Sequence, residues 1–342
     1  MNRRKRVIST LATMLSALTV VFSVAAMPVS AATTTTPKTQ TATGAGNGIK
    51  ISPVRSELTI NPGSSVTLDV FVTNVTSQAA TFQLLANDFI AGGDESGNPA
   101  VILNPNQAAP SHGLKQYIAP VSNVTIQPQE TKDVKVVISM PDNIAAGGYY
   151  GAIRVAPAGS SQQSNKNITL SASVASLILV KVPGNIKEQV SIASFDARTG
   201  DKSRSIFTSK KNISGVVRFQ NEGNIQEAPF GKIILKDIRG HQIGSYEINT
   251  TDPKGNVLPD SIRKFNAKLD HLGSFGRYTL EGNFGYGSAG QLLTAKSTFY
   301  IIPIPVIVTL IILAVLIIVA IFEIPRMIRS YNKRVLRRAG RE

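Results

Sequence analysis

The sequence predicts an all-β protein made of two antiparallel β-sandwiches followed by a single transmembrane helix. Apolar residues alternate with polar ones through most of residues 49–300, which is the pattern of half-buried strands. Turn residues such as Asn61-Pro62-Gly63 and Gly92-Gly93-Asp94 separate these stretches. A run of 22 almost purely apolar residues, Ile301 to Phe322, lies near the C-terminal end.

Composition excludes several classes of protein. The chain has 342 residues, 42% of them hydrophobic, so it can form cores and is not wholly disordered. It contains no Cys, which excludes a disulfide framework, a thiolate metal site, a cysteine nucleophile and a lipoprotein anchor. The net charge is +15, but eleven basic groups lie in residues 3–6 and 326–341. A charge concentrated at the ends indicates membrane topology and not a nucleic-acid surface.

The N-terminal residues 1–31 are interpreted as a signal peptide. Four basic residues precede an apolar stretch from Val7 to Ala26, and small residues around Ala31 offer a cleavage site. An uncleaved anchor helix is the alternative, which the hydroxyl residues in the stretch disfavour. Residues 32–48, rich in Thr, are expected to form a flexible linker.

Residues 301–322 are expected to span a membrane. A helix of this length covers about 33 Å, close to the hydrocarbon thickness of about 30 Å. Basic residues fill the tail, 323–342, so the positive-inside rule places the tail in the cytoplasm. The predicted location is therefore the cell membrane, in a single-pass topology with an extracytoplasmic N-terminus.

The first sandwich is assigned to residues 49–183 and the second to residues 184–300. Strands are predicted around Val66–Val72, Phe82–Ala86, Val134–Met140, Ile153–Val155, Ile168–Val174 and the apolar run Ser171–Val182, and then around Val190–Ile192, Ile213–Phe219, Gly231–Leu235, Arg277–Gly282 and Leu292–Tyr300. Ile60-Asn61-Pro62 and Ile126-Gln127-Pro128 each precede three alternating apolar residues, which indicates two equivalent corners of one sandwich.

Charge divides with the domains. Residues 49–183 carry eight basic and eight acidic groups, whereas residues 184–300 carry sixteen and eleven. The second domain could therefore meet anionic headgroups or wall polymer. An ordinary solvated surface is the favoured interpretation.

Several motifs together resemble a bacterial protein family. They are Pro62-Gly63 before a strand ending in Asn74, the segment Pro141–Val155 with its Gly-Gly-Tyr-Tyr-Gly core, Phe219–Asn224 with Pro229, and Val257-Leu258-Pro259 before the apolar span. In this layout the chain resembles the WxL-interacting surface proteins. The resemblance implies two immunoglobulin-like β-sandwiches on a C-terminal anchor, with peptidoglycan bound by the first domain and a partner surface protein by the second. Tyr149, Tyr150 and Arg154 are the possible ligand contacts.

No catalytic, cofactor or metal site is predicted. His112, His241 and His271 are scattered, and Gly285-x-Gly287-x-x-Gly290 precedes a strand and so predicts a hairpin loop. The segment Asp94–Asn98 offers oxygen ligands but lacks the calcium-loop series, and a solvated loop is expected there.

The predicted function is that of a membrane-anchored bacterial surface protein and not of an enzyme. It would bind cell-wall polymer or another surface protein through its sandwiches. The alternatives are a chaperone-like protein that completes a partner's fold by edge-strand pairing, or an unrecognised surface enzyme.

Overall fold

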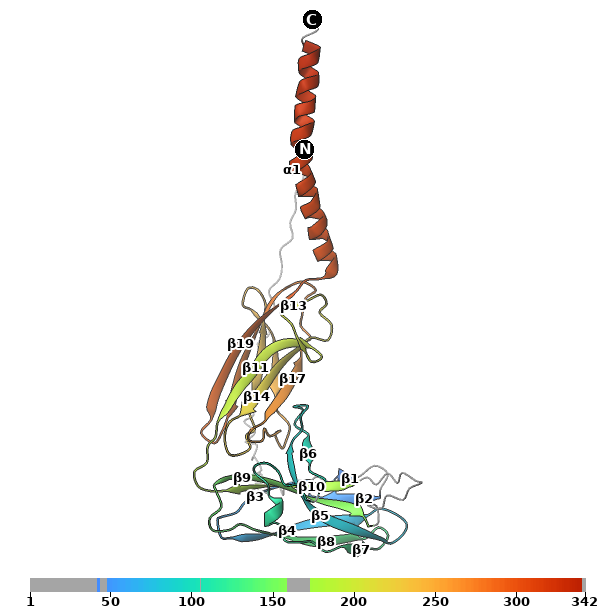
Figure 1. Cartoon of the computed structure of the whole chain (residues 1–342), viewed down its shortest axis with the longest axis vertical. Helices are drawn as coiled ribbons and strands as arrows, with labels where there is room; N and C mark the ends of the chain where they lie inside the picture. Colours follow the sequence, from blue (N-terminus) through green and yellow to red (C-terminus); the bar gives the residue numbers. More distant parts are fainter. Residues whose placement is uncertain (1–41, 44–47, 105, 159–172, 340–342) are drawn as a thin grey trace, which may run out of the picture. The chain divides into compact units, whose positions relative to one another are not determined.

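The structure is a computed structural model that describes residues 42–43, 48–104, 106–158 and 173–339 (Figure 1). It is a β protein with one long C-terminal helix, as the sequence predicts. The signal peptide, most of the Thr-rich linker, the predicted strand positions Ile168 to Ala172 and the last three residues of the basic tail lie outside the described residues.

The first sandwich consists of two sheets. One has the order β1-β2-β4-β8, and the other has the order β3-β10-β9-β5-β6 with β7 also paired to β5. The strands are β1 (Ala42–Thr43), β2 (Ile49–Ser52), β3 (Arg55–Thr59), β4 (Ser65–Asn74), β5 (Ala80–Ala91), β6 (Pro99–Val101), β7 (Val124–Ile126), β8 (Thr131–Ser139), β9 (Gly147–Pro157) and β10 (Val174–Val182), and a 3-10 turn, η1, covers Lys115–Tyr117.

The core of this sandwich comes from the alternating positions. Val70 and Val72 of β4 and Val136 and Ile138 of β8 are completely buried, while the residues between them face solvent. Burial of such side chains drives the packing of the two sheets. The repeated Ile-x-Pro corner is also explained, because the two strands that follow it, β4 and β8, pair with each other in one sheet.

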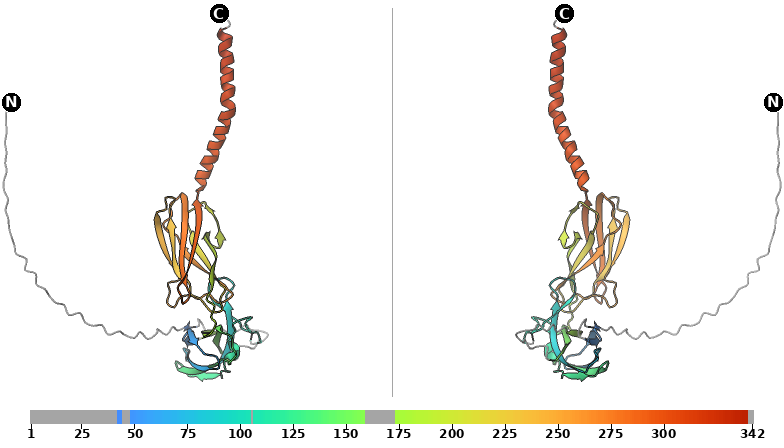
Figure 2. Two further views of the ribbon diagram at one scale, coloured as in Figure 1. Left: turned by 90° about the vertical axis from the view of Figure 1, so that its left-hand side faces the viewer. Right: turned by 90° about the vertical axis from the view of Figure 1, so that its right-hand side faces the viewer.

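The second sandwich repeats this architecture (Figure 2). Its sheets have the orders β12-β11-β14-β17 and β13-β19-β18-β15-β16. The strands are β11 (Val190–Thr199), β12 (Lys202–Ser203), β13 (Ile206–Phe207), β14 (Ser214–Asn221), β15 (Phe230–Lys236), β16 (Gln242–Ile248), β17 (Ile262–Lys268), β18 (Gly276–Tyr286) and β19 (Gln291–Ile301).

The two sandwiches share one strand order. The sheet β2-β4-β8 corresponds to β11-β14-β17, and β3-β10-β9-β5-β6 corresponds to β13-β19-β18-β15-β16. In each sandwich a short strand, β3 or β13, pairs in parallel with the last strand, while the other neighbours pair antiparallel. A four-stranded sheet packed on a larger sheet of this kind is an immunoglobulin-like arrangement.

A buried asparagine holds the same corner in both sandwiches. The Asn74 amide donates to the carbonyls of Gln78 (2.8 Å) and Ile126 (3.0 Å), and its oxygen accepts from Thr76 N. The Asn221 amide likewise donates to Ile225 O (2.7 Å) and Val257 O (2.9 Å). Each asparagine thus donates to one carbonyl of the turn that follows β4 or β14 and to one carbonyl of a separate segment, so it ties the two segments together.

The C-terminal helix α1 covers Ile304–Ala339 and differs from the predicted span. Ile301, expected to begin the span, is instead the last residue of β19. Pro303 accepts from the backbone N–H groups of Val306 and Ile307, so the helix starts after it. The described part of the basic tail continues the helix, which agrees with the helix propensity of Lys and Arg. Residues Ile304–Arg329 are long and apolar enough to cross a membrane.

Candidate binding sites in the first sandwich and in the inter-sandwich cleft

The structure separates the two predicted ligand tyrosines, because neighbouring residues of a strand face opposite sides of a sheet. Tyr149 lies on the side of the first core, where its hydroxyl donates to Ala145 O at 2.9 Å. Tyr150 lies on the other side and is only 3% exposed. Its buried hydroxyl is therefore not accessible to a ligand in this structure, in contrast to the expectation that Tyr150 and Tyr149 share one binding surface. Burial also raises the pKa of both phenols.

Tyr149 lines an open groove on the first sandwich. The ring of Tyr149 meets those of Tyr117 and His112 edge-on, with centroids 5.8 and 6.4 Å apart. The segment 106–120 forms the rest of the groove, with a volume of about 670 Å³. Asp88 fixes this segment by accepting from the backbone N–H groups of Ala109 (3.0 Å) and Lys115 (2.7 Å). Polar side chains, which include Asp88 and Lys115, lie beside an aromatic ring in this groove, and such a lining suits a hydroxyl-rich ligand such as a glycan.

Arg154, the third predicted contact, lies farther along β9. Its Nε donates to Asn87 Oδ1 at 3.2 Å, and burial lowers the pKa of its guanidinium. It is half-buried and does not line the Tyr149 groove. The three predicted contacts therefore do not form one site.

The β5–β6 hairpin contacts the second sandwich, which corrects the expectation of a solvated loop at Asp94–Asn98. In Arg218 of β14, Nε donates to Glu95 Oε2 at 2.6 Å, and Nη2 donates to Glu95 Oε1. This bidentate pair holds the pKa of the Glu95 carboxyl below its usual range. Lys264 N also donates to Glu95 O at 2.8 Å. The loop thus serves as a contact between the sandwiches, and no metal-binding group of acidic, His or Cys residues occurs in the described part of the chain.

A second set of contacts surrounds Tyr150. Its hydroxyl donates to Gln226 Oε1 at 2.9 Å, and Gly148 N donates to Asn224 O at 2.7 Å. Asn224 returns a bond from its amide to Ala146 O at 3.0 Å. The Gly-Gly-Tyr-Tyr segment therefore joins the second sandwich, a role that its sequence alone does not distinguish from ligand binding.

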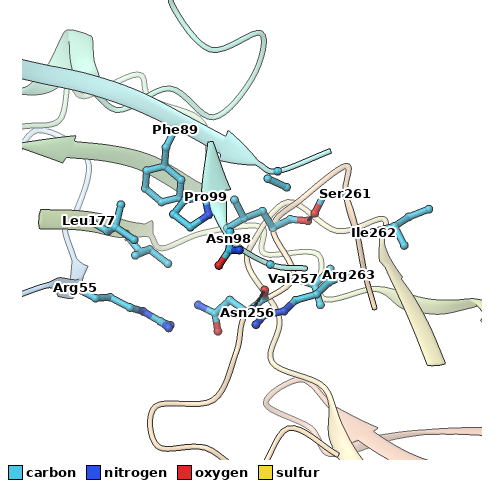
Figure 3. Close-up of a pocket in the computed structure, with 15 residues that line it drawn as sticks. Arg55, Phe89, Asn98, Pro99, Leu177, Asn256, Val257, Ser261, Ile262 and Arg263 are labelled. Atoms are coloured by element: carbon cyan, nitrogen blue, oxygen red, sulfur yellow. Dashed lines mark hydrogen bonds between the residues drawn. The ribbon is translucent and has the colours of Figure 1, made fainter. Parts of the chain in front are cut away.

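An apolar cavity with two arginines lies between the β5–β6 hairpin, β10 and the 256–263 segment (Figure 3). Its volume is about 70 Å³. Its apolar wall comes from both sandwiches and consists of Phe89, Pro99, Leu177, Leu179, Val257, Leu258 and Ile262. Arg55, at the start of β3, and Arg263, in β17, approach it from different sandwiches.

The two arginines have unused hydrogen-bond donors. Arg263 donates from Nη1 to Asn256 O at 2.8 Å, and Arg55 pairs with the carboxylate of Glu57. The Nε atoms of both side chains are buried and have no acceptor. Burial, and then the neighbouring charge of Arg55, lower the pKa of Arg263. Within the described residues Arg263 forms no ion pair. An anion in the cavity would accept hydrogen bonds from the unpaired Nε atoms, and its charge would offset the burial and the repulsion by Arg55 that lower the pKa of Arg263.

Two glycines leave space for the Arg263 guanidinium. A Cβ at Gly97 would lie 2.1 Å from guanidinium atoms, and one at Gly255 would lie 2.6 Å away. Gly97 also has a φ of +85°, which side chains with a Cβ rarely adopt. The guanidinium packs over the Phe265 ring at 5.0 Å. The sequence analysis did not predict this site, because Arg55 and Arg263 come from segments more than two hundred residues apart. The sequence shows only that one arginine lies near the start of β3 and another near the start of β17.

Comparison with known proteins gives structural neighbours alone. No protein-family model matches the chain, and no curated protein matches its sequence. A chaperone–tip adhesin complex of CFA/I fimbriae is 13% identical with a TM-score of 0.37, covering 75% of this chain and 99% of that chain. The CsuC–CsuE chaperone–tip subunit complex of Acinetobacter baumannii is 13% identical with a TM-score of 0.35, covering 72% and 96%.

A third neighbour, the CupB2 chaperone of Pseudomonas aeruginosa, is 12% identical with a TM-score of 0.31, covering 71% of this chain and 97% of that chain. These solved structures are fimbrial chaperones built from β-sandwiches. All three TM-scores are below 0.5, so the similarity carries no functional inference to this chain.

Proposed function

We propose that this chain is a membrane-anchored extracytoplasmic binding protein whose cleft between the sandwiches takes the carboxylate end of a polypeptide partner. The supporting observation is the pair of buried, acceptor-free Nε atoms of Arg55 and Arg263 beside an apolar wall. Guanidinium groups bind carboxylates through charge-assisted hydrogen bonds. An apolar last side chain of the partner would fit against Phe89 and Leu179.

The position of Arg55 favours an extended ligand. Arg55 begins β3, which is an edge strand and pairs only with β10 in the described part of the chain. A polypeptide held at its end by Arg55 could add to this edge by main-chain pairing. This is the chaperone-like mode, in which the protein would supply a strand edge to a partner. The proposal rests on the cavity and on β3, and not on likeness to the fimbrial chaperones.

The topology belongs to the same proposal. α1 crosses the cell membrane once, the sandwiches lie outside, and the basic C-terminal tail lies in the cytoplasm. The apolar segment Ile304–Arg329 and the basic residues that follow it support this orientation. The signal peptide would direct the sandwiches outward before its removal.

The groove at Tyr149 supports a second candidate function, the binding of wall glycan by the first sandwich. Its lining of Asn106, Gln107, Ser111 and Gln116 beside an aromatic ring carries this candidate. The resemblance to WxL-interacting surface proteins, which implies peptidoglycan binding through the first domain, leads to the same surface. A wall polymer and a protein partner would then occupy different sites.

Peptide binding to the purified full chain tests the cleft. The probes are one ten-residue peptide with an apolar last residue, made with a free carboxylate and with an amidated end, and the readout is fluorescence anisotropy. We expect the amidated peptide to bind roughly tenfold more weakly, since charge-assisted bonds are lost. Arg263→Gln should abolish that difference, whereas Arg239→Gln, at an exposed site away from the cleft, should preserve it. Equal binding of both peptides would overturn the cleft as a carboxylate site.

Binding to isolated peptidoglycan tests the groove independently. Tyr149→Ala should reduce co-sedimentation of the full chain with peptidoglycan, because the groove loses its aromatic wall. Arg263→Gln should leave it unchanged. Retention of full binding by Tyr149→Ala would exclude the groove as the glycan site.

A further inference from the structure

One end of the second sandwich is joined to the apolar helix by a very short connection. β19 ends at Ile301 and α1 begins at Ile304, so only Ile302 and Pro303 lie between them. Ile302 N donates to Phe207 O at 2.8 Å, which ties this connection to the sandwich. Two extended residues reach at most about 7 Å. The headgroup layer on each side of a bilayer is about 5–8 Å thick, so this end must lie within or against it once the helix spans the membrane.

Strand register identifies the loops at that end. Gly276 pairs with Ile301, and Ser214 pairs with Lys268, so the loops leading into β14 and β18 lie there. Lys236 pairs with Thr279, which adds the β15–β16 turn. We call the residues 208–213, 237–241 and 268–277 the membrane-side end. They come from three loops that are separate in sequence and gathered by the fold.

The membrane-side end is basic. It carries five basic side chains, which are Lys210, Lys211, Arg239, Lys268 and Arg277, and two carboxylates, Asp237 and Asp270. All five basic side chains are exposed, and none forms an ion pair with another described residue. This end therefore accounts for +3 of the +5 excess of residues 184–300, although it contains fewer than a quarter of them. An ordinary solvated surface would distribute that excess more evenly.

Exposed apolar side chains accompany these charges. Phe275 is 63% exposed and precedes the residue paired with Ile301, and Ile238 in the β15–β16 turn is 70% exposed. Tyr300 and its parallel neighbour Ile206 are also exposed. Aromatic and basic side chains together are typical of protein surfaces at the membrane interface. Neither feature alone would distinguish a lipid surface from a soluble polyanion.

We propose that the membrane-side end docks on the anionic phospholipid headgroups around α1, with Phe275 and Ile238 inserted between them. This inference rests on the proposed span by α1. Docking restrains the second sandwich relative to the bilayer, so that the protein is anchored at two points rather than one. Charge attraction to anionic lipid and burial of the two apolar side chains act together.

A tryptophan reporter tests the docking, since the chain contains no Trp. The full chain carrying Phe275→Trp is placed in nanodiscs of phosphatidylglycerol that contain a lipid spin-labelled near the headgroup. The matched control is Leu292→Trp, which is 81% exposed in the wild type and lies at the opposite end of β19. We expect spin-label quenching of the Phe275→Trp fluorescence to be at least twofold stronger than that of the control. Equal quenching of the two reporters would overturn the proposal.

Charge variants separate docking on anionic lipid from docking through apolar contact alone. Lys210→Glu with Lys211→Glu should reduce the quenching of Phe275→Trp, and so should replacement of phosphatidylglycerol by phosphatidylcholine. Lys187→Glu with Lys232→Glu, at exposed sites outside the membrane-side end, should not. Equal quenching of Phe275→Trp in phosphatidylglycerol and in phosphatidylcholine would overturn the assignment to anionic lipid. Binding of soluble polyglycerol phosphate to the membrane-side end, without quenching in nanodiscs, would overturn it as well. A chain that fails to enter nanodiscs would overturn the span and the docking together, whereas entry without quenching would overturn the docking alone.

Discussion

At the scale of single residues, Asn74 shows how a polar side chain can be essential to a β core. It is completely buried and supplies hydrogen bonds to two carbonyls from separate segments. Asn74→Ala removes the buried side-chain donor to the Ile126 carbonyl and the acceptor for the Thr76 N–H group, while the Gln78 carbonyl keeps the Thr76 hydroxyl as a donor. We expect the free energy of unfolding to fall by about 2–3 kcal/mol. Urea denaturation followed by circular dichroism measures it, and Asn266→Ala, at an exposed site, should change it by less than about 0.5 kcal/mol. Similar losses for both variants would contradict this role.

Glu227 gives a pH prediction at the same scale. Its carboxyl is 6% exposed, and burial followed by the charge of Glu188 raises its pKa to about 7 from 4.5. The folded state therefore holds this proton when the unfolded chain has released it. Stability should fall as the pH rises from about 4.5 to about 7, and the loss should be complete above that range. Glu227→Gln should remove this part of the pH dependence, measured as the melting temperature from pH 4 to 8. An unchanged profile would show that Glu227 does not titrate in this way.

At the scale of elements, the β5–β6 hairpin couples the sandwiches through Glu95 and Arg218. Their side chains are only 26% and 24% exposed, and the pair is bidentate. A double-mutant cycle with Glu95→Gln and Arg218→Gln should give a coupling energy of about 1–2 kcal/mol in urea unfolding. The exposed pair Lys135 and Asp69 serves as the control and should give less than about 0.5 kcal/mol. A coupling no larger than that of the control would mean that the hairpin contact contributes little.

The elements also show what periodicity can and cannot predict. β4 and β8 were predictable because each has an apolar residue at every second position, and these are the residues that the burial pattern of β8 shows to be buried. β17, Ile-Arg-Lys-Phe-Asn-Ala-Lys, was missed because one residue, Ala267, is buried and its strand character comes from pairing with β14. The strands β12 and β13 are too short to show a period. Apolar periodicity therefore predicts the strands that contribute several side chains to the core. It does not predict strands whose conformation depends mainly on pairing with a neighbouring strand.

The candidate site was less predictable than the fold. Tyr149 and Tyr150 were predicted to share one ligand surface, but the strand pleat places the first side chain at a groove and the second at the contact between the sandwiches. Arg55 and Arg263 meet only after both sandwiches have formed and the β5–β6 hairpin has placed Gly97 beside them. The spacing of residues in the sequence does not predict that Arg55 and Arg263 lie close together, because their proximity depends on contacts between the two sandwiches.

At the scale of the whole molecule, the proposed topology predicts which positions a membrane-impermeant reagent can reach. The chain has no Cys, so single cysteines are clean reporters. Leu292→Cys should react with a maleimide added to intact cells, whereas Ser330→Cys should react only after the membrane is permeabilised. Mass-tag gel shifts measure both. Labelling of Ser330→Cys in intact cells, with Leu292→Cys protected, would reverse the orientation.

The direct passage from β19 into α1 has a mechanical consequence. A pull on a captured partner would reach the membrane through β19, whose eleven residues pair with β18 along their full length. Force along a strand axis loads such a ladder in shear, so its hydrogen bonds share the load instead of opening one at a time from an end. The parallel pairing of β13 with the final two residues of β19 fastens the point where tension would enter. The last strand would therefore work as a tether under tension, and the short connection would leave almost no slack between ligand and membrane.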